Sequence, residues 1–301
     1  MPRAPILLLA FLLSTGALTV RPDAKLMASS TGEQPSSEPQ KATVKTVSAT
    51  TADIPFDDDE SQAELELLIL ANQSRQQAGA PPLTLDAGLS KAALAHGYRM
   101  LDARQLSHQF EDEPSVLQRL VSSTGLQLDQ TAENVALDYG PERGHQHLML
   151  SPSHRANLLN PAYNVVGLAV VRSGDRLYIV QDFGHAVASY SSVEWKDRVA
   201  AAVNQLRHDG GQRALPRLDL GNADDLACSM MHADKLGTSP VQALAERYTV
   251  FTFTSLHPDE LPTGANHAIA SRNLRSFSVG ACYGRTETYP TGVYWVVLSL
   301  E

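Results

Sequence analysis

The two halves of this chain carry the same residue pattern in the same order. The matched pieces are NQSR at 72–75 with NQLR at 204–207, Gly79 with Gly211, PLTLD at 82–86 with LPRLD at 215–219, and two β-rich runs near the end of each half. An internal repeat of this kind predicts two related structural units rather than one continuous core. The alternative is an unrelated second domain whose matches arise by chance.

Hydrophobic spacing predicts helices and one antiparallel hairpin in the first unit. Residues 60–79, 87–101 and 113–125 have apolar residues at helical spacing. The second of these helices is expected to place five residues on one face: Leu89, Ala92, Ala93, His96 and Met100. VVGLAVV at 165–171 and LYIVQDF at 177–183 flank a Ser-Gly-Asp turn, which predicts a β-hairpin. The fold class is therefore α+β.

The N-terminal segment is typical of an exported protein. Residues 1–20 contain one arginine and an apolar run too short to span a bilayer, which predicts a secretory signal peptide. A buried N-terminal helix is the alternative. Residues 21–59 have almost no large apolar residues, so we expect a disordered tether. The protein should then be secreted to the extracellular space or the periplasm.

Charge and missing motifs exclude several classes of function. The 24 Lys and Arg against 33 Asp and Glu give a net charge of −9, so we expect no nucleic-acid partner and no docking on anionic membranes by charge. The chain has no G-x-S-x-G, no H-E-x-x-H and no glycine-rich phosphate loop. Serine hydrolases, zincins and nucleotide enzymes each need one of these.

An ordered set of motifs in the first unit resembles a known family. The set is N-x-x-R-x-x-x-G, PLTLD, SH, AENVA, SPSHRANLLNP, VVGLAVV and VQDFG. It resembles the bacterial, SCP-like extracellular branch of the CAP superfamily (cysteine-rich secretory, antigen 5 and pathogenesis-related proteins). The resemblance implies an α-β-α sandwich over residues 60–186. A linker at 187–194 and a second, shortened CAP-like α+β domain at 195–301 would follow.

The resemblance also implies a cleft built from two histidines and two glutamates. Three of these carry over to this chain: His108, Glu133 and His154. The fourth, a glutamate after a tryptophan, has no match, because Leu148 stands at the tryptophan position and Ser151 near the glutamate. Chemistry that needs both carboxylates is therefore in doubt.

The residues themselves point to a metal site. Ser151 suits a helix N-cap and Pro152 the first helical position, so His154 falls in the first turn, where the helix dipole favours a neutral imidazole. We expect His108 and Glu133 to lie on separate loops and to converge on His154 around a divalent ion, zinc or calcium. The alternative is that both histidines are hydrogen-bonded structural residues.

Other polar residues near these motifs receive supporting roles. Asn134, Ser151 and Arg155 are expected to support the cleft. His145 and His147 are expected to be exposed. Asp182 could face the cleft or end a strand, and these two readings stay open.

The repeat predicts cleft counterparts in the second unit. Gly167 and Gly280 are 113 positions apart, and this offset places Glu133 on Glu246 and His154 on His267. At the NQ-x-R segment the offset is 132, so about 19 residues are missing where His108 would have its counterpart. The second unit is therefore a degenerate repeat.

Two cysteines fall in the second unit. Cys228 lies in its second helical run and Cys282 in its first strand, so a disulfide is geometrically reasonable in an oxidising compartment. Two buried free thiols are the alternative.

Three functions remain from different classes. The first is a secreted binding module whose cleft holds a divalent metal and a small or lipid-like ligand. The second is a metal-dependent hydrolase with Glu133 as general base, which leaves enzymatic activity uncertain. The third is an extracellular scaffold that binds a protein or envelope polymer and has a vestigial cleft.

The tether can be tested by limited proteolysis of the mature protein. Cleavage should occur within residues 21–59 before either unit is cut, because a segment without a core is accessible to protease. A mature protein in which this segment resists cleavage would contradict the expectation.

Overall fold

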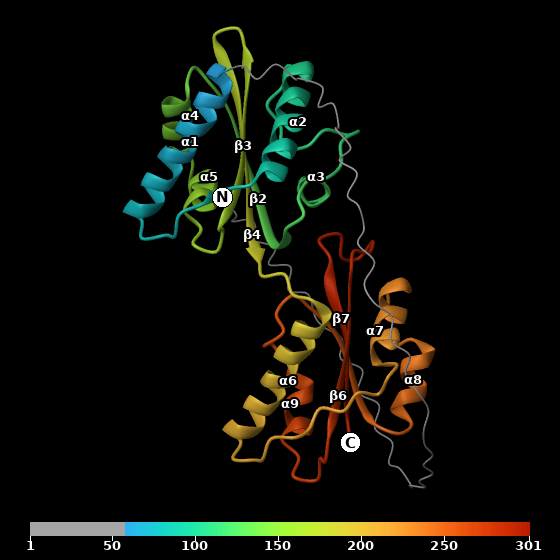
Figure 1. Ribbon diagram of the computed structural model, residues 1–301. Coiled ribbons are helices and arrows are strands. Elements are labelled where there is room, and N and C mark those ends of the chain that lie inside the picture. The colour runs from blue at the N-terminus through green and yellow to red at the C-terminus, as the bar shows by residue number, and fades with distance from the viewer. Residues whose placement is uncertain (1–57) are drawn as a thin grey trace, which may run out of the picture.

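The computed structural model describes residues 58–301, which form two units placed end to end (Figure 1). Each unit combines helices with its own sheet, so the expected α+β class is confirmed. The expected signal peptide at 1–20 and nearly all of the tether at 21–59 lie outside the described residues. Within 58–301, no helix is both long and apolar enough to cross a membrane.

The first unit is a sheet covered by helices on both faces. Its elements are α1 (Asp58–Gln77), β1 (Thr84–Leu85), α2 (Ala87–Ala103), α3 (Val116–Ser123), β2 (Gln127–Asp138), α4 (Pro141–Leu150), α5 (Pro152–Leu159), β3 (Val165–Ser173) and β4 (Arg176–Val187). The strand order is β1-β3-β4-β2, with β1 parallel to β3 and the other pairs antiparallel. Helices α1, α4 and α5 cover one face, and α2 and α3 cover the other (Figure 1). This is the α-β-α sandwich that the resemblance implied.

Local patterns explain most of these elements. All five residues expected on one face of α2 are buried. The hairpin between β3 and β4 turns at Gly174, which has a φ of +65°. Strand β2 differs from expectation, because Glu133 lies inside a twelve-residue strand and not on a loop. Polar residues at 133 and 134 are buried on opposite faces of this strand, so the sequence does not alternate as a half-exposed strand would.

The second unit has the same strand order. Its elements are α6 (Ser192–Asp209), α7 (Ala223–His232), α8 (Ser239–Ala245), β5 (Thr249–Ser255), α9 (Thr263–Ile269), β6 (Phe277–Gly284) and β7 (Val293–Leu300). The sheet order is β5-β7-β6, and Arg217 forms a parallel bridge to Phe277 on the free side of β6, as β1 does on β3. Helices α6 and α9 cover one face and α7 and α8 the other (Figure 1). No counterpart of α4 occurs between β5 and α9.

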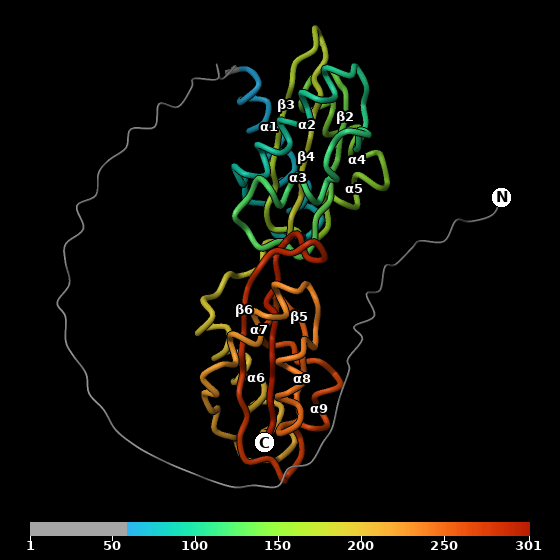
Figure 2. The backbone as a smooth tube through the Cα atoms, turned by 90° about the vertical axis from the view of Figure 1, so that its right-hand side faces the viewer, coloured from blue at the N-terminus to red at the C-terminus, as the bar shows by residue number. Residues whose placement is uncertain are grey.

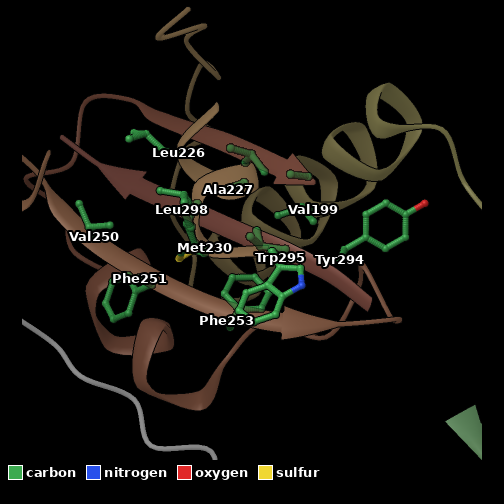
Figure 3. Packing of buried hydrophobic residues seen from close by; sticks show 14 of the residues in the cluster. Val199, Leu226, Ala227, Met230, Val250, Phe251, Phe253, Tyr294, Trp295 and Leu298 are labelled. Carbon is green, nitrogen blue, oxygen red and sulfur yellow. The ribbon is translucent and has the colours of Figure 1, made fainter. Parts of the chain in front are cut away.

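One continuous apolar core holds the second unit together. Side chains from α6 and α7 meet those of β5 and β7, including Val199, Leu226, Phe253 and Leu298 (Figure 3). A disulfide between Cys228 and Cys282 joins α7 to β6 with Cα atoms 5.0 Å apart. The core therefore has a covalent link across one of its two helical faces.

A buried arginine makes the same hydrogen bonds in each unit, and we call Arg75 and Arg207 the clamp arginines. The acceptors are carbonyl oxygens: Pro81 (2.7 Å), Leu158 (2.8 Å) and Asn160 (2.9 Å) for Arg75, and Arg213 (2.8 Å), Ile269 (2.6 Å) and Ser271 (3.0 Å) for Arg207. Arg75 also donates to the Tyr163 carbonyl at 2.7 Å. The shared NQ-x-R segment thus ties α1 and α6 to equivalent parts of each unit.

Two glycines allow close packing of a helix on a strand. A Cβ on Gly167 would lie 2.1 Å from the carbonyl carbon of Leu89 in α2, and one on Gly280 would lie 2.0 Å from the carbonyl oxygen of Ala223 in α7. Since real Cβ atoms do not approach so closely, both positions require glycine. Gly167 and Gly280 are therefore equivalent, as the sequence predicted.

Strand register places the counterpart of Glu133 at Thr252. The two paths across the sheets are Gly167–Asp182–Glu133 and Gly280–Val297–Thr252. The expected counterpart Glu246 is wrong, because it caps the C-terminus of α8 outside the sheet.

The counterpart of His154 is Ala265 and not His267. The clamp arginines bind the carbonyls of Leu158 and Ile269, and the same step back along α5 and α9 leads to His154 and Ala265. His267 lies in the last turn of α9. The offset of 113 holds at the glycines but fails here, because residues are also missing where α4 has no counterpart.

The clamp arginines should stabilise both units to a similar degree. Replacing Arg75 or Arg207 with Met leaves several buried carbonyls without a donor, so we expect each variant to lose about 3 kcal/mol of unfolding free energy. Fluorescence of Trp195 and Trp295 in urea measures the second unit, and circular dichroism measures both, so the first unit is followed by the part of the circular dichroism transition that fluorescence does not report. Exposed Arg155, with one bond to the Met149 carbonyl, is the control and should change stability by less than about 0.5 kcal/mol. A loss under about 1 kcal/mol for either clamp would contradict this role.

Candidate functional site

A buried carboxylate at the edge of the first sheet organises the candidate cleft. Glu133 on β2 has a side chain only 2% exposed. Its Oε1 accepts a hydrogen bond from Nδ1 of His108 at 2.8 Å, and its Oε2 accepts one from Nη2 of Arg119. His108 comes from the connection between α2 and α3, and Arg119 from α3. The structure thus joins three segments around one carboxylate.

Arg119 also connects Glu133 to a second buried pair. Its Nη1 lies 3.1 Å from Oε2 of Glu113, and the Arg119 side chain is 6% exposed. Oε1 of Glu113 pairs with Nδ1 of His96 at 2.7 Å, and Nε2 of His96 donates to the Ser107 carbonyl at 2.8 Å. These bonds hold the connection that carries His108 against α2.

Little in the sequence predicts this network of buried ion pairs and hydrogen bonds. Arg119 follows a capping box formed by Ser115 and Gln118, which starts α3, but a single arginine in an amphipathic helix carries no spacing signal. His96 belongs to the expected buried face of α2, yet its partner Glu113 lies in an irregular segment. Only the resemblance pointed to His108 and Glu133 together.

His154 reaches the same site from the opposite helical layer. Its ring centroid lies 6.2 Å from that of His108. Nδ2 of Asn134 donates to the His154 carbonyl at 3.1 Å, and Nδ2 of Asn157 donates to Oδ1 of Asn134 at 3.0 Å. Asn134 is fully buried, so these bonds anchor the first turn of α5 to β2.

Ser151 and Arg155 lie farther from the cleft chemistry. Ser151 is the N-cap of α5 and Pro152 begins the helix, but the Ser151 hydroxyl makes no capping bond and lies 3.4 Å from the Ser153 hydroxyl. Arg155 donates to the Met149 carbonyl at 3.0 Å. Both residues connect α4 to α5, and neither contacts Glu133 in the described residues.

The two cleft histidines have opposite pKa shifts. The hydrogen bond to Glu133 raises the pKa of His108. Burial, and then the neighbouring His108, lower the pKa of His154. The expectation of a neutral His154 thus agrees in direction, although burial and not the helix dipole is the main cause. With Nδ1–H of His108 directed at Glu133, a neutral His108 keeps its lone pair on Nε2.

The family comparison agrees with this geometry. The model of the CAP family, described as the cysteine-rich secretory protein family, matches residues 68–183. Those residues contain all the side chains of the cleft. The first unit is a CAP domain. The resemblance to the CAP superfamily is therefore confirmed, and the bacterial relative described next supports the bacterial branch.

A bacterial relative extends the comparison. The chain is 30% identical over 157 residues to the uncharacterized protein YkwD of Bacillus subtilis strain 168, and the match covers 52% of this chain and 60% of that protein. The chain thus spans less than two thirds of the relative that it matches.

Three solved structures resemble the CAP domain. An outer surface protein from Borrelia burgdorferi has a TM-score of 0.39 and 20% identity, covering 42% of this chain and 94% of that chain. An extracellular protein with an SCP domain from Bacillus anthracis strain Ames has a TM-score of 0.40 and 22% identity, covering 45% of each chain. NaASP2 with Zn²⁺ has a TM-score of 0.31 and 14% identity, covering 44% of this chain and 84% of that chain. Identities this low do not transfer function.

The expected three-residue metal set of His108, Glu133 and His154 is not assembled as a metal site in the described residues. Within residues 58–301, no group of three or more His, Cys, Asp or Glu is arranged to hold a metal ion. Both oxygens of Glu133 already accept hydrogen bonds. Of the three expected ligands, this leaves the imidazoles of His108 and His154, whose ring centroids lie 6.2 Å apart.

His145 and His147 were both expected to be exposed, and only His147 is. His145 is only 6% exposed, and its Nε2 lies 2.8 Å from the Ser74 hydroxyl on α1. Burial lowers the pKa of His145. The side chain of His147 is 54% exposed and pairs with Asp138. The expectation that both are exposed is therefore wrong for His145, which helps to pack α4 against α1.

Asp182 lies beside Glu133 and was not assigned from the sequence. It is fully buried in the middle of β4, directly opposite Glu133 in the strand register. Burial, and then the Glu133 carboxylate, raise the pKa of Asp182 well above its usual range. Cross-strand partners point to the same face of a sheet, so Asp182 lies beside Glu133, and its raised pKa favours the protonated form there.

Asp182→Asn should become more stable relative to the natural protein as pH rises. Folded Asp182 keeps a proton that the unfolded chain releases above about pH 4, so its contribution to stability falls by up to about 1.4 kcal/mol per pH unit above that value. Asparagine is neutral at every pH and has no such loss. Urea midpoints at pH 4 to 7 measure the difference, with exposed Asp175→Asn as control. A constant difference for Asp182→Asn across this range would show that the carboxyl ionises in the folded protein.

Proposed function

We propose that this is a secreted CAP-domain protein whose cleft binds a divalent metal ion through Nε2 of His108 and the imidazole of His154. The observation that carries the proposal is the 2.8 Å hydrogen bond between Nδ1 of His108 and Glu133. A carboxylate that accepts a hydrogen bond from Nδ1–H orients the ring and raises the basicity of Nε2, as it does for many zinc-bound histidines.

In this proposal Glu133 is an orienting carboxylate. Arg119 and His108 each bond to one of its two oxygens, and its side chain is only 2% exposed, so little of either oxygen is open to the ion or to water. This disfavours the metal-dependent hydrolase, in which Glu133 would take a proton from bound water. The fourth cleft carboxylate is also missing, because Ser151 stands near its position.

Zinc is the ion that the donors favour. Imidazole nitrogen suits zinc, whereas calcium takes six to eight oxygen ligands. Two histidines and water leave positions at which a small or lipid-like molecule could bind the ion.

We further propose that residues 195–301 are a degenerate copy of the CAP domain that acts as a scaffold. The shared strand order, the clamp arginines and the paired glycines support a common origin. In this copy Thr252 and Ala265 occupy the positions equivalent to Glu133 and His154. The copy therefore has no equivalent metal site. An envelope polymer or another protein is the kind of partner that a scaffold of this type would bind.

Secretion is part of the proposal for two reasons. The apolar run at 1–20 has the features of a signal peptide. The disulfide between Cys228 and Cys282 suits an oxidising compartment.

Zinc binding can be measured by thermal melting and calorimetry. Zinc at 100 times its Kd should add about 2.7 kcal/mol of stability, calcium should add none, and His154→Ala should abolish the zinc effect. His147→Ala, which changes an exposed histidine on α4, is the control and should keep it. Zinc binds only the neutral imidazole of His108, and the pKa of His108 is raised. As the pH is lowered, zinc affinity should therefore begin to fall at a pH above the ordinary histidine pKa of about 6.5. A zinc effect that survives both His108→Ala and His154→Ala would overturn the proposal.

A further inference from the structure

The second unit forms hydrogen bonds with one short segment of the CAP domain. Three hydrogen bonds that cross between residues 58–187 and 195–301 go to the Val121 carbonyl, the Thr124 carbonyl and the Asp129 carboxylate. All three acceptors lie within residues 121–129, which cover the end of α3, the connection after it and the start of β2. The turn between β6 and β7 reaches the base of the first unit at this point (Figure 2).

Arg285 closes the C-terminal end of α3. Its Nη1 donates to the Val121 carbonyl at 2.6 Å and its Nη2 to the Thr124 carbonyl at 3.3 Å. The last carbonyls of a helix have no partner within the helix, and a positive charge there is favourable. Helix α3 has only eight residues, so both of its ends matter: Ser115 caps the first, and the second unit caps the other.

A second contact holds the start of β2. Asp129 accepts a hydrogen bond from Nδ1 of His185 on β4 at 2.6 Å and one from Nε2 of His257 in the second unit at 3.1 Å. One carboxylate thus links β2, β4 and the loop after β5. Gln127, two residues earlier, donates to the Ser189 hydroxyl of the linker at 3.3 Å.

The segment that the second unit contacts lies between two residues whose side chains are bonded to each other, Arg119 and Glu133. Arg119 is on α3, just before the connection, and Glu133 is on β2, just after it. The separation that lets Arg119 bond to Glu133 depends on how α3 sits against β2, and the second unit contacts both elements. Contacts between domains of one chain otherwise leave relative motion as the default.

We propose that the second unit is a brace for the CAP cleft and that Arg285 is its main positioning residue. By capping α3 while His257 holds Asp129, the second unit keeps Arg119 on Glu133 and therefore keeps His108 oriented. This role gives the degenerate copy a function without a cleft of its own. It does not depend on metal binding.

Arg285→Gln in the full chain tests the brace. Hydrogen exchange of the amides in residues 116–133 should become about tenfold faster, because a charged donor to the helix end is lost. The guanidinium protons of Arg119, which the structure buries, should also exchange faster in nitrogen-15 NMR spectra. Arg217→Gln is the matched control, since Arg217 pairs with Asp197 at 2.7 Å within the second unit. It should leave both readouts at their natural values.

His257→Ala tests the same proposal from the other contact. It should speed exchange at the start of β2 and at the Arg119 guanidinium, by less than Arg285→Gln. Fluorescence of Trp195 and Trp295 verifies that the second unit stays folded in each variant. If exchange in residues 116–133 and at Arg119 is unchanged in both variants, the second unit is a passive attachment and the proposal is overturned.

Discussion

The buried guanidinium of Arg75 is the contact on which the frame of the CAP domain depends. Among residues 58–301 it has no carboxylate partner, and four carbonyl oxygens from three segments accept its hydrogen bonds. Burial of a charge is costly unless its hydrogen bonds are complete, and here the carbonyls at the C-terminus of α5 also supply a favourable dipole. Because α5 carries His154, this contact sets one wall of the cleft as well as the packing of α1.

The opposite wall is built from charges that balance one another. Arg119 lies between Glu113 and Glu133, and it is buried with both of them. A third carboxyl, Asp182, adjoins Glu133, and two adjacent carboxylates in one buried site repel each other. Burial, and then this repulsion, raise the pKa of Asp182 well above its usual range, while Arg119 and His108 both bond to Glu133. The His108 ring is thus oriented by contacts that reach through the whole α2 and α3 layer.

Hydrophobic spacing was enough to predict the regular elements of the first unit, because α2 and the β3–β4 hairpin bury one clear apolar face each. Strand β2 was missed, since Glu133 and Asn134 are buried polar residues whose partners come from distant segments. The same cause hid Arg119 and Asp182, whose roles depend on neighbours that no local pattern reveals. The NQ-x-R segment and the glycines predict equivalent positions in the two units, but a single offset cannot locate Thr252 and Ala265, because the second unit is shorter in more than one place.

A comparison of the two units separates residues that the fold needs from residues that the cleft needs. The second unit keeps the clamp arginine and the close-packed glycine, so these features belong to the frame. It replaces Glu133, His154 and Asp182 with Thr252, Ala265 and Val297, and its described core is one apolar cluster that includes Val297 and Ala265. Exchange of buried ion pairs for apolar residues is often neutral or stabilising. The frame can therefore fold without the charges of the cleft, so the stability of the frame does not by itself require them.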